Sequence, residues 1–159
     1  MAILKLKPYC RDTVWGGSRL KTEYGIQYDG PNLAEAWVLS CHPQGASTIE
    51  NGPFAGKTLP EYLTAQGPGA LGTACAAFAA FPVLIKLIDT QGDSSIQVHP
   101  SDAYARAHEG QYGKTEMWYI LEADPGAFAY YGFEREIPRE EFARRIADDT
   151  LPPCCTVSR

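Results

Sequence analysis

The chain has 159 residues, 45% of them apolar, which suits a single domain with a hydrophobic core. Its formal net charge is −5 and its basic residues are scattered, so we expect no nucleic-acid partner. No run reaches the about 18 apolar residues of a membrane span, and the first residues lack the apolar segment of a signal peptide, so we expect no membrane association. The five cysteines include no Cys-x-x-Cys pair, which favours reduced thiols and a cytoplasmic location.

Short strands and turns dominate the pattern along the chain. In the opening residues, apolar and polar side chains alternate until Pro8, which is typical of a strand that ends at a proline. The same period of two places Glu35, Trp37 and Leu39 on one face of the next strand. The predicted strands cover residues 1–9, 34–40, 81–89, 94–99, 116–122 and 127–131.

Helices are predicted at three places between these strands. Thr58 and Glu61 have the spacing of a capping box, and Ser101 and Asp102 can cap a short helical turn. The segment 67–80 is rich in Gly and Ala and fits either a loose helix or a loop. The predicted helices cover residues 59–65, 101–107 and an amphipathic segment at 138–149. Many strands with a few helices favour a mostly β fold, either an antiparallel barrel or a jelly roll.

A pair of polar side chains in the strand at 94–99 is a candidate metal site. Gln97 and His99 are two residues apart, so they share a face, which in a small barrel is the lumen. Glu116 could add a carboxylate, and the resulting oxygen and nitrogen donors suit Zn²⁺ or a similar ion. Lys114 would lie on the face of Glu116. On spacing alone the commoner outcome is structural, with His99 hydrogen-bonded in the core, Gln97 capping a strand and Glu116 solvated.

Longer blocks of sequence carry a family resemblance. FPVLIKLIDTQGDSSIQVHPSDAYA at 81–105 and YGKTEMWYIL at 112–121 resemble the class I mannose-6-phosphate isomerases in their short bacterial form. WGG at 15–17 and AEAWVLS at 34–40 are also similar to that family, and the resemblance runs to about residue 151. It implies a cupin-type jelly-roll β barrel. It also implies interconversion of mannose 6-phosphate and fructose 6-phosphate through a cis-enediol, with a metal polarising the substrate oxygens.

The resemblance also implies a role for each matching residue. In the family a metal, usually zinc, is held by the residues that match Gln97, His99 and Glu116 and by a histidine further on. Lys114 matches an active-site lysine that positions the substrate or transfers a proton. An adjacent cation would lower the pKa of such a lysine, which is the condition for it to act as a base.

The substrate contacts are likewise implied by the resemblance. Lys86 and Ser95 match positions near the substrate phosphate, which suits an ammonium and a hydroxyl group. Lys86 could instead reach water from a barrel edge. Trp15 matches a residue that lines the sugar pocket, although for a tryptophan a place in the core is the commoner outcome. The remaining conspicuous residues are expected to be structural, and these are Trp37, Trp118, His42, His108, Asp102, Arg144 and Arg145.

The end of the sequence departs from the family pattern. No residue matches the fourth metal ligand, and LPPCCTVSR at 151–159 does not have the pattern of a strand. Residues 153–159 can be written in codons that, when read in a frame shifted by two nucleotides, encode Leu-Leu-His-Arg-Val-Pro. That peptide resembles the segment that follows this point in the family. We therefore expect a partial domain over 1–151, incomplete at the C-terminus, with an atypical tail at 152–159 that a frameshift would explain.

These expectations define the function and its alternatives. We expect a metal-dependent aldose–ketose isomerase with one Zn²⁺ per chain, impaired by the missing ligand, with a phosphosugar as its partner. Open sheet edges would favour self-association. One alternative is a non-catalytic cupin fragment that binds a metal or a phosphosugar. Another is a cupin with different metal chemistry, such as an oxygenase, which the absence of a His-x-His pair disfavours.

Overall fold

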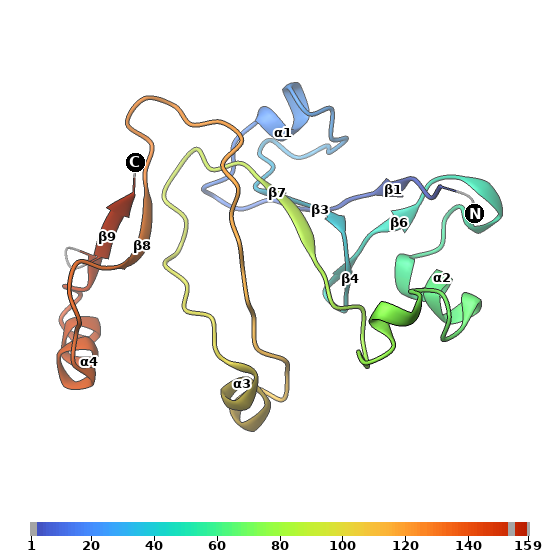
Figure 1. Ribbon diagram of the computed structural model, residues 1–159. Helices are drawn as coiled ribbons and strands as arrows, with labels where there is room; N and C mark the ends of the chain where they lie inside the picture. Colours follow the sequence, from blue (N-terminus) through green and yellow to red (C-terminus); the bar gives the residue numbers. More distant parts are fainter. Residues whose placement is uncertain (1–2, 153–154, 159) are drawn as a thin grey trace. The chain divides into compact units, whose positions relative to one another are not determined.

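A computed structural model describes residues 3–152 and 155–158 of the chain. Short antiparallel strands make up most of the sheet structure, and the helices are few and short (Figure 1). The strands are β1 (Leu6–Lys7), β2 (Tyr9–Arg11), β3 (Glu35–Leu39), β4 (Cys41–His42), β5 (Gly45–Ala46), β6 (Thr48–Ile49), β7 (Ile85–Ile88), β8 (Ala129–Phe133) and β9 (Cys155–Ser158). The helices are α1 (Arg19–Thr22), η1 (Gly52–Phe54), α2 (Leu59–Gln66), η2 (Thr73–Cys75), α3 (Asp102–His108) and α4 (Arg139–Ala147). The expected mostly β fold with short helices is confirmed at this level.

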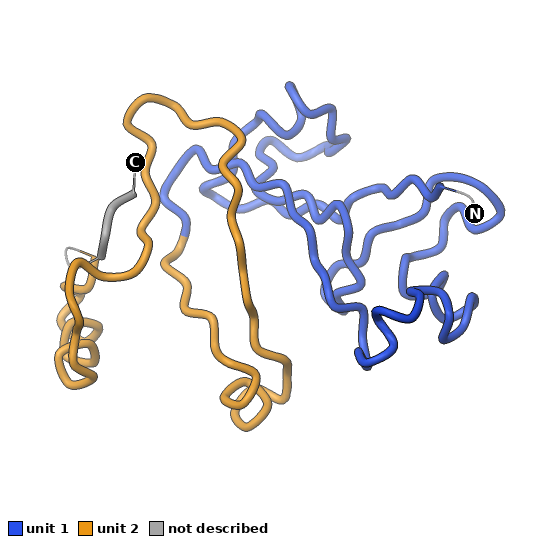
Figure 2. The backbone as a smooth tube through the Cα atoms, viewed as in Figure 1, with its two compact units in different colours: residues 1–94 blue, residues 95–159 orange. Residues whose placement is uncertain are grey.

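The chain divides into two compact units, Met1–Ser94 and Ser95–Arg159 (Figure 2). The first unit contains a three-stranded sheet in the order β2-β3-β7 and the two-stranded sheets β1-β6 and β4-β5. The second unit contains the two-stranded sheet β8-β9 and helices α3 and α4. In the part of the chain that the structure describes, every helix is too short or too polar to cross a membrane.

The register of the three-stranded sheet decides which side chains share a face. Trp37 on the central strand β3 lies between Tyr9 on β2 and Lys86 on β7. Beyond this row, a bulge between Trp37 and Leu39 shifts the register. The Trp37 indole donates a hydrogen bond of 2.6 Å to Glu35 Oε2, which confirms that Glu35 and Trp37 share a face.

The hydrophobic core of the first unit lies on the opposite face of β3. Ala36 is fully buried and packs with Leu20 and Leu33. Because successive side chains in a strand point to opposite faces, Ala36 faces the core while its neighbour Trp37 faces away from it. Trp37 is also buried, which confirms it as a structural residue. The side chains packed against this cluster are Cys10, Ile26, Tyr28, Val38 and Leu87.

The Trp-Gly-Gly loop is glycine-rich because the chain approaches other segments closely there. A Cβ atom at Gly16 would lie 2.8 Å from the backbone nitrogen of Ala34, and one at Gly17 would lie within 3 Å of the Asp89 carboxylate. Asp89 Oδ2 accepts a hydrogen bond of 2.8 Å from the backbone nitrogen of Arg19. Gly17 therefore allows Asp89, which follows β7, to hydrogen-bond to the start of α1, and Gly16 allows the chain to approach Ala34.

Local capping signals predicted the helices correctly. Thr58 Oγ1 accepts a hydrogen bond from the Glu61 backbone, and the Glu61 carboxylate accepts one from the Thr58 backbone, as a capping box requires. Ser101 caps α3 by accepting a hydrogen bond from the Tyr104 backbone. The predicted amphipathic helix corresponds to α4, which begins after Pro138.

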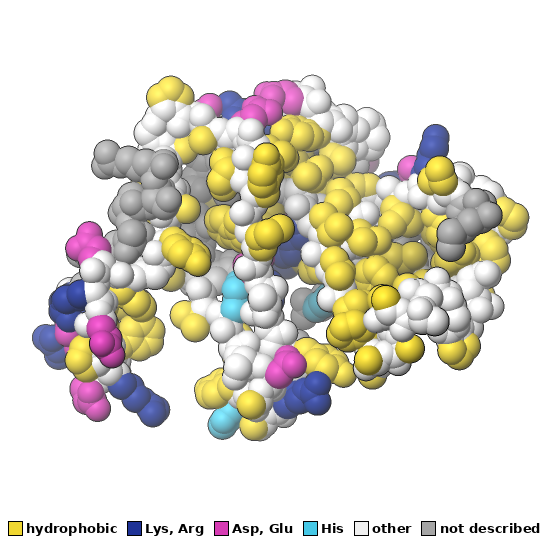
Figure 3. All heavy atoms as spheres, in the orientation of Figure 1, with side chains coloured by type: hydrophobic (Ala, Val, Ile, Leu, Met, Phe, Trp, Pro, Cys, Tyr) yellow, Lys and Arg dark blue, Asp and Glu magenta, His cyan; other side chains and the backbone are white. Residues whose placement is uncertain are grey.

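Two predicted strands are wrong. Among the described residues, 94–99 and 116–122 belong to no strand ladder, and the strand predicted over 81–89 begins only at β7. A strand needs a neighbour that takes up its backbone hydrogen bonds, and sequence alternation does not supply one. Trp118, expected in the core, is 57% exposed. Other hydrophobic side chains are also exposed (Figure 3), and in these segments they are Ile96, Val98, Met117, Tyr119, Ile120 and Leu121.

The structure also decides three segments that sequence reasoning described only loosely. The segment 67–80 is a loop that contains the short helix η2. The opening strand ends before Pro8 as predicted but resumes directly as β2, because proline breaks the ladder only locally. In the tail at 152–159, β9 pairs with β8, so the expectation that it contains no strand is wrong. Residues 153, 154 and 159 of that tail lie outside the described part.

Candidate functional site

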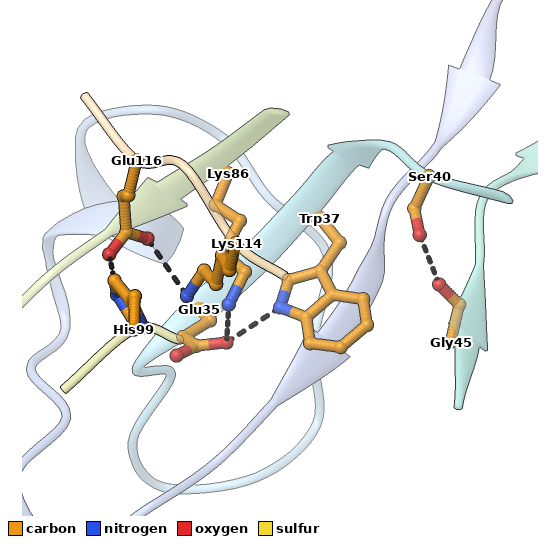
Figure 4. Close-up of polar contacts among 8 residues, drawn as sticks. All are labelled: Glu35, Trp37, Ser40, Gly45, Lys86, His99, Lys114 and Glu116. Atoms are coloured by element: carbon orange, nitrogen blue, oxygen red, sulfur yellow. Dashed lines mark hydrogen bonds and ion pairs between the residues drawn. The ribbon is translucent and has the colours of Figure 1, made fainter. Parts of the chain in front are cut away.

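Three of the predicted site residues meet in the second unit. His99 Nε2 lies 2.6 Å from Glu116 Oε2, and Lys114 Nζ lies 3.1 Å from Glu116 Oε1. Figure 4 shows the His99 and Lys114 side chains converging on the Glu116 carboxylate. The His99 and Glu116 side chains are 25% and 23% exposed, so both remain accessible to a small ligand. The site is therefore a half-buried carboxylate with an imidazole on one oxygen and an ammonium on the other.

The turn around α3 brings these residues together. After α3 the chain returns beside the residues that precede it, and Gly113 donates a backbone hydrogen bond of 2.8 Å to Asp102 Oδ1. Lys114 donates its backbone N–H to the carbonyl oxygen of Pro100 over 3.2 Å. A Cβ atom at Gly113 would lie 2.6 Å or less from the backbone of Pro100 and its neighbours, so only glycine permits this approach. Lys114 and Glu116 are thereby placed next to His99.

Asp102 has a structural role that differs slightly from the expected one. Ser101 is the capping residue of α3, and Asp102 instead fixes the returning chain at Gly113. Asp102 thus makes a structural contact at this turn.

The electrostatics of the site favour the charged form of Glu116. Partial burial opposes ionisation of this carboxyl, but the hydrogen bonds from His99, Lys114 and Trp118 outweigh it, and the pKa of Glu116 is lowered from its ordinary value. An ionised carboxylate beside an imidazole nitrogen is the donor chemistry that Zn²⁺ takes in proteins. His99 and Glu116 could therefore supply two of the donors that a divalent metal needs.

The other predicted donors do not join this cluster. Gln97 and Ser95 are exposed, and among the described residues neither belongs to the hydrogen-bonded set of His99, Lys114 and Glu116. Within that same part of the chain, no group of three or more His, Cys, Asp or Glu side chains is placed to hold a metal. Because 94–99 is not a paired strand, the shared face of Gln97 and His99 stays a prediction.

A second polar cluster lies in the first unit and contains Lys86. Lys86 Nζ lies 3.1 Å from Glu35 Oε2, and the same oxygen accepts the hydrogen bond from Trp37. Lys86 Nζ also lies 4.6 Å from the centre of the Trp37 ring, a cation–π contact. The Lys86 and Glu35 side chains are only 16% and 12% exposed. The alternative in which Lys86 extends into water is therefore wrong, since its ammonium is bound within the sheet.

Sequence reasoning missed Glu35 as a functional candidate. Partial burial opposes its ionisation, but hydrogen bonds from Trp37 and Lys86 dominate, and the pKa of Glu35 is lowered. The available signal was the alternation that puts Glu35 and Trp37 on one face. The missing information was the register that sets Lys86 opposite Trp37.

The remaining candidates make local contacts. Trp15 is half-buried, and its carbonyl oxygen accepts backbone hydrogen bonds from Gln91 and Gly92. His42 is half-buried on β4 and packs edge-on against Trp37. His108 on α3 stacks against Tyr104.

Comparisons with known proteins agree on one family. The model of the phosphomannose isomerase type I catalytic domain matches residues 3–130. The mannose-6-phosphate isomerase of Streptococcus mutans serotype c is 40% identical over 144 residues, which cover 91% of this chain and 44% of that protein. A Bacillus subtilis protein named "Probable mannose-6-phosphate isomerase" is 39% identical over 144 residues, which cover 90% of this chain and 44% of that protein.

A solved structure agrees with these sequence matches. The crystal structure of the mannose 6-phosphate isomerase from Bacillus subtilis matches with a TM-score of 0.89 and 33% sequence identity. The match covers 100% of this chain and 50% of that chain. The chain thus spans less than half the length of the two curated relatives and half of the solved one.

Proposed function

Because the chain belongs to the type I phosphomannose isomerase family, we propose that it interconverts mannose 6-phosphate and fructose 6-phosphate. The observation that carries this proposal is the cluster of His99, Lys114 and Glu116, which lies inside the matched segment 3–130. The proposed reaction moves one proton from C2 to C1 and another from O2 to O1, through an enediol. No oxidant is needed, because the aldehyde carbon is reduced as the hydroxyl-bearing carbon is oxidised.

In this proposal His99 and Glu116 would hold a divalent metal, with Gln97 as a third donor. Zn²⁺ bound there would polarise the substrate oxygens at C1 and C2 and so favour enolisation. Lys114 is the proposed catalytic residue, because its ammonium lies 3.1 Å from Glu116 Oε1 and its side chain is 41% exposed. It would position a substrate oxygen or transfer a proton to or from that oxygen.

The proposal gives the phosphate and sugar contacts to Lys86, Ser95 and Trp15. An ammonium and a hydroxyl group suit a phosphate dianion. Lys86 is already held by Glu35, so a phosphate would have to share the ammonium with that carboxylate. This arrangement would orient Lys86 but weaken its attraction for an anion.

The proposal also extends to architecture and location. We assign residues 1–151 to a partial cupin-type jelly roll, which the antiparallel pairing and the short helices support. A cytoplasmic location is supported by the free thiols of Cys10, Cys41 and Cys75.

The direct test is formation of fructose 6-phosphate from mannose 6-phosphate by the 159-residue chain, with added Zn²⁺ and with a chelator. We expect chelator-sensitive turnover that His99→Ala and Glu116→Gln abolish. His108→Ala is the matched control, because this exposed histidine lies on α3, stacks against Tyr104 and is not one of the predicted metal donors. Turnover that survives chelation would contradict the metal, and no turnover from folded protein would contradict the enzymatic assignment.

A specific observation also favours the second candidate, a non-catalytic cupin fragment that binds a metal or phosphosugar. The described residues bring together two of the three predicted metal donors, and the chain spans 44% of its curated relatives. The exposed apolar side chains of Val98, Met117 and Tyr119 would favour self-association under this reading. Zinc binding without turnover, together with a concentration-dependent dimer in sedimentation, is its expected signature.

A further inference from the structure

We propose that Arg11 is a further phosphate-binding residue and supplies more of the attraction for the phosphate group of the phosphosugar than Lys86 does. The inference rests on the proposed function in taking mannose 6-phosphate as the ligand. All the residues that carry it belong to the first unit, Met1–Ser94.

Arg11 projects from the face of the three-stranded sheet that also carries Lys86. In the antiparallel register, Arg11 on β2 lies opposite Glu35, and Lys86 on β7 lies opposite Trp37. Side chains of directly opposed residues share a face of the sheet. This face is turned away from the core around Ala36. Arg11 and Lys86 therefore approach the central strand β3 from its two neighbours, on the same side of the sheet.

The Trp37 ring orients both cations. Arg11 Cζ lies 5.6 Å and Lys86 Nζ lies 4.6 Å from the centre of this ring. Trp37 is only 3% exposed, so the ring is a fixed support. A cation–π contact holds the guanidinium by its charge, and its N–H groups remain donors for a ligand. Arg11 is thus oriented on this face while it keeps the groups that bind an anion.

The charges on this face favour Arg11 over Lys86 as the anion contact. Figure 4 shows Lys86 and Trp37 converging on one oxygen of Glu35, and the ammonium lies 3.1 Å from it. This pair is largely buried, whereas Arg11 is exposed. Arg11 and Lys86 bring two positive charges and Glu35 brings one negative charge, so one positive charge remains. A guanidinium also presents its donors in a planar fork that matches phosphate oxygens.

The backbone places Arg11 beside the Trp-Gly-Gly loop. The Ala34 nitrogen donates a hydrogen bond of 3.0 Å to the carbonyl oxygen of Arg11. A Cβ atom at Gly16 would lie 2.8 Å from the same nitrogen, so the loop and Arg11 both lie against Ala34. Trp15 in this loop is the proposed sugar contact. The arrangement favours one ligand with its phosphate at Arg11 and its sugar at Trp15.

The test is equilibrium dialysis of the 159-residue chain with mannose 6-phosphate, which counts bound phosphate and does not depend on turnover. Arg11→Met should raise the dissociation constant about tenfold. Arg11→Lys keeps the charge but loses the fork, so it should raise the dissociation constant by only about threefold. Arg139→Met is the matched control, because it removes an exposed arginine in the other unit, and its dissociation constant should stay within about twofold of the parent value.

Glu35→Gln provides a second, independent test. It releases Lys86 from its ion pair, so it should tighten binding in the parent chain and recover part of the loss in Arg11→Met. Circular dichroism confirms that each variant is folded, and Arg11→Lys provides the comparison if Arg11→Met does not fold.

The outcomes separate this inference from the proposed function. If the parent chain binds mannose 6-phosphate and neither Arg11 variant weakens binding, the role of Arg11 is refuted and the proposed function stands. If the folded parent chain does not bind mannose 6-phosphate, both are refuted. Inorganic phosphate should bind the parent chain at least about tenfold more weakly than mannose 6-phosphate. Equal affinities would identify a simple anion site and would overturn the assignment to a phosphosugar.

Discussion

The pairing of Lys86 with Glu35 makes a quantitative prediction for stability. Lys86→Met removes the ammonium that lies 3.1 Å from Glu35 Oε2 and leaves the carboxylate with the Trp37 indole as its hydrogen-bond donor at 2.6 Å. The same change removes the cation–π contact with the Trp37 ring. Glu35 is 12% exposed, so water can compensate only a small part of the lost charge.

The size of the effect follows from this intermediate burial. Exposed ion pairs contribute about 0–1 kcal/mol, whereas removing one partner of a fully buried pair costs about 3–5 kcal/mol. With both side chains slightly exposed, we expect Lys86→Met to lower the free energy of unfolding by about 2 kcal/mol. Glu35→Gln keeps an acceptor for Trp37 and should cost about 1 kcal/mol. In the double variant, the loss in the free energy of unfolding should be smaller than the sum of the two single losses by about 1–2 kcal/mol.

The assay is urea unfolding followed by tryptophan fluorescence for the parent chain, both single variants and the double variant. Lys5→Met is the control for removing an exposed lysine charge, and it should change the free energy of unfolding by less than about 0.5 kcal/mol. The reasoning is refuted if Lys86→Met costs no more than this control. It is also refuted if the two single losses add to within about 0.3 kcal/mol in the double variant.

Three further results are expected from the structure. Gly17→Ala forces a Cβ atom into the Asp89 carboxylate and should lower the free energy of unfolding by about 1–3 kcal/mol, whereas no loss in urea unfolding would contradict that contact. Thr58→Ala removes the capping oxygen of α2 and should cost about 1 kcal/mol, and Thr58→Ser should restore most of it. Hydrogen bonds from Arg135 and Arg145 lower the pKa of Glu141 from 4.5 to about 2, so these ion pairs stabilise α4 at neutral pH and lose their contribution as the pH falls from about 5 to 2. Amide protection factors in α4, which are exchange rates relative to the intrinsic rate at each pH, should be lower at pH 3 than at pH 6, and Glu141→Gln should reduce this difference.

The sequence was most informative where the physics is local. A capping box, a serine cap and an amphipathic repeat each involve residues within one or two turns, so α2, α3 and α4 could be predicted from their own segments. The Gln-x-His pair and the Lys-x-Glu block likewise identified three residues that do meet, His99, Lys114 and Glu116. The family, too, was evident from the order of these blocks, and the comparisons confirm it.

Tertiary structure decided the features that depend on a distant partner. Residue composition predicted strands at 94–99 and 116–122, but pairing requires a neighbouring backbone, and among the described residues neither segment has one. The bond between Glu35 and Lys86 joins residues 51 positions apart and depends on the register of β3 against β7. His99 reaches Glu116 because Gly113 lets the returning chain lie against Pro100. The sequence by itself thus determined which chemical groups the candidate site contains. The distances between these groups were decided by long-range packing. The physical reason is that backbone contacts set the nearest neighbours of a side chain in a sheet or a turn, and no local pattern encodes those contacts.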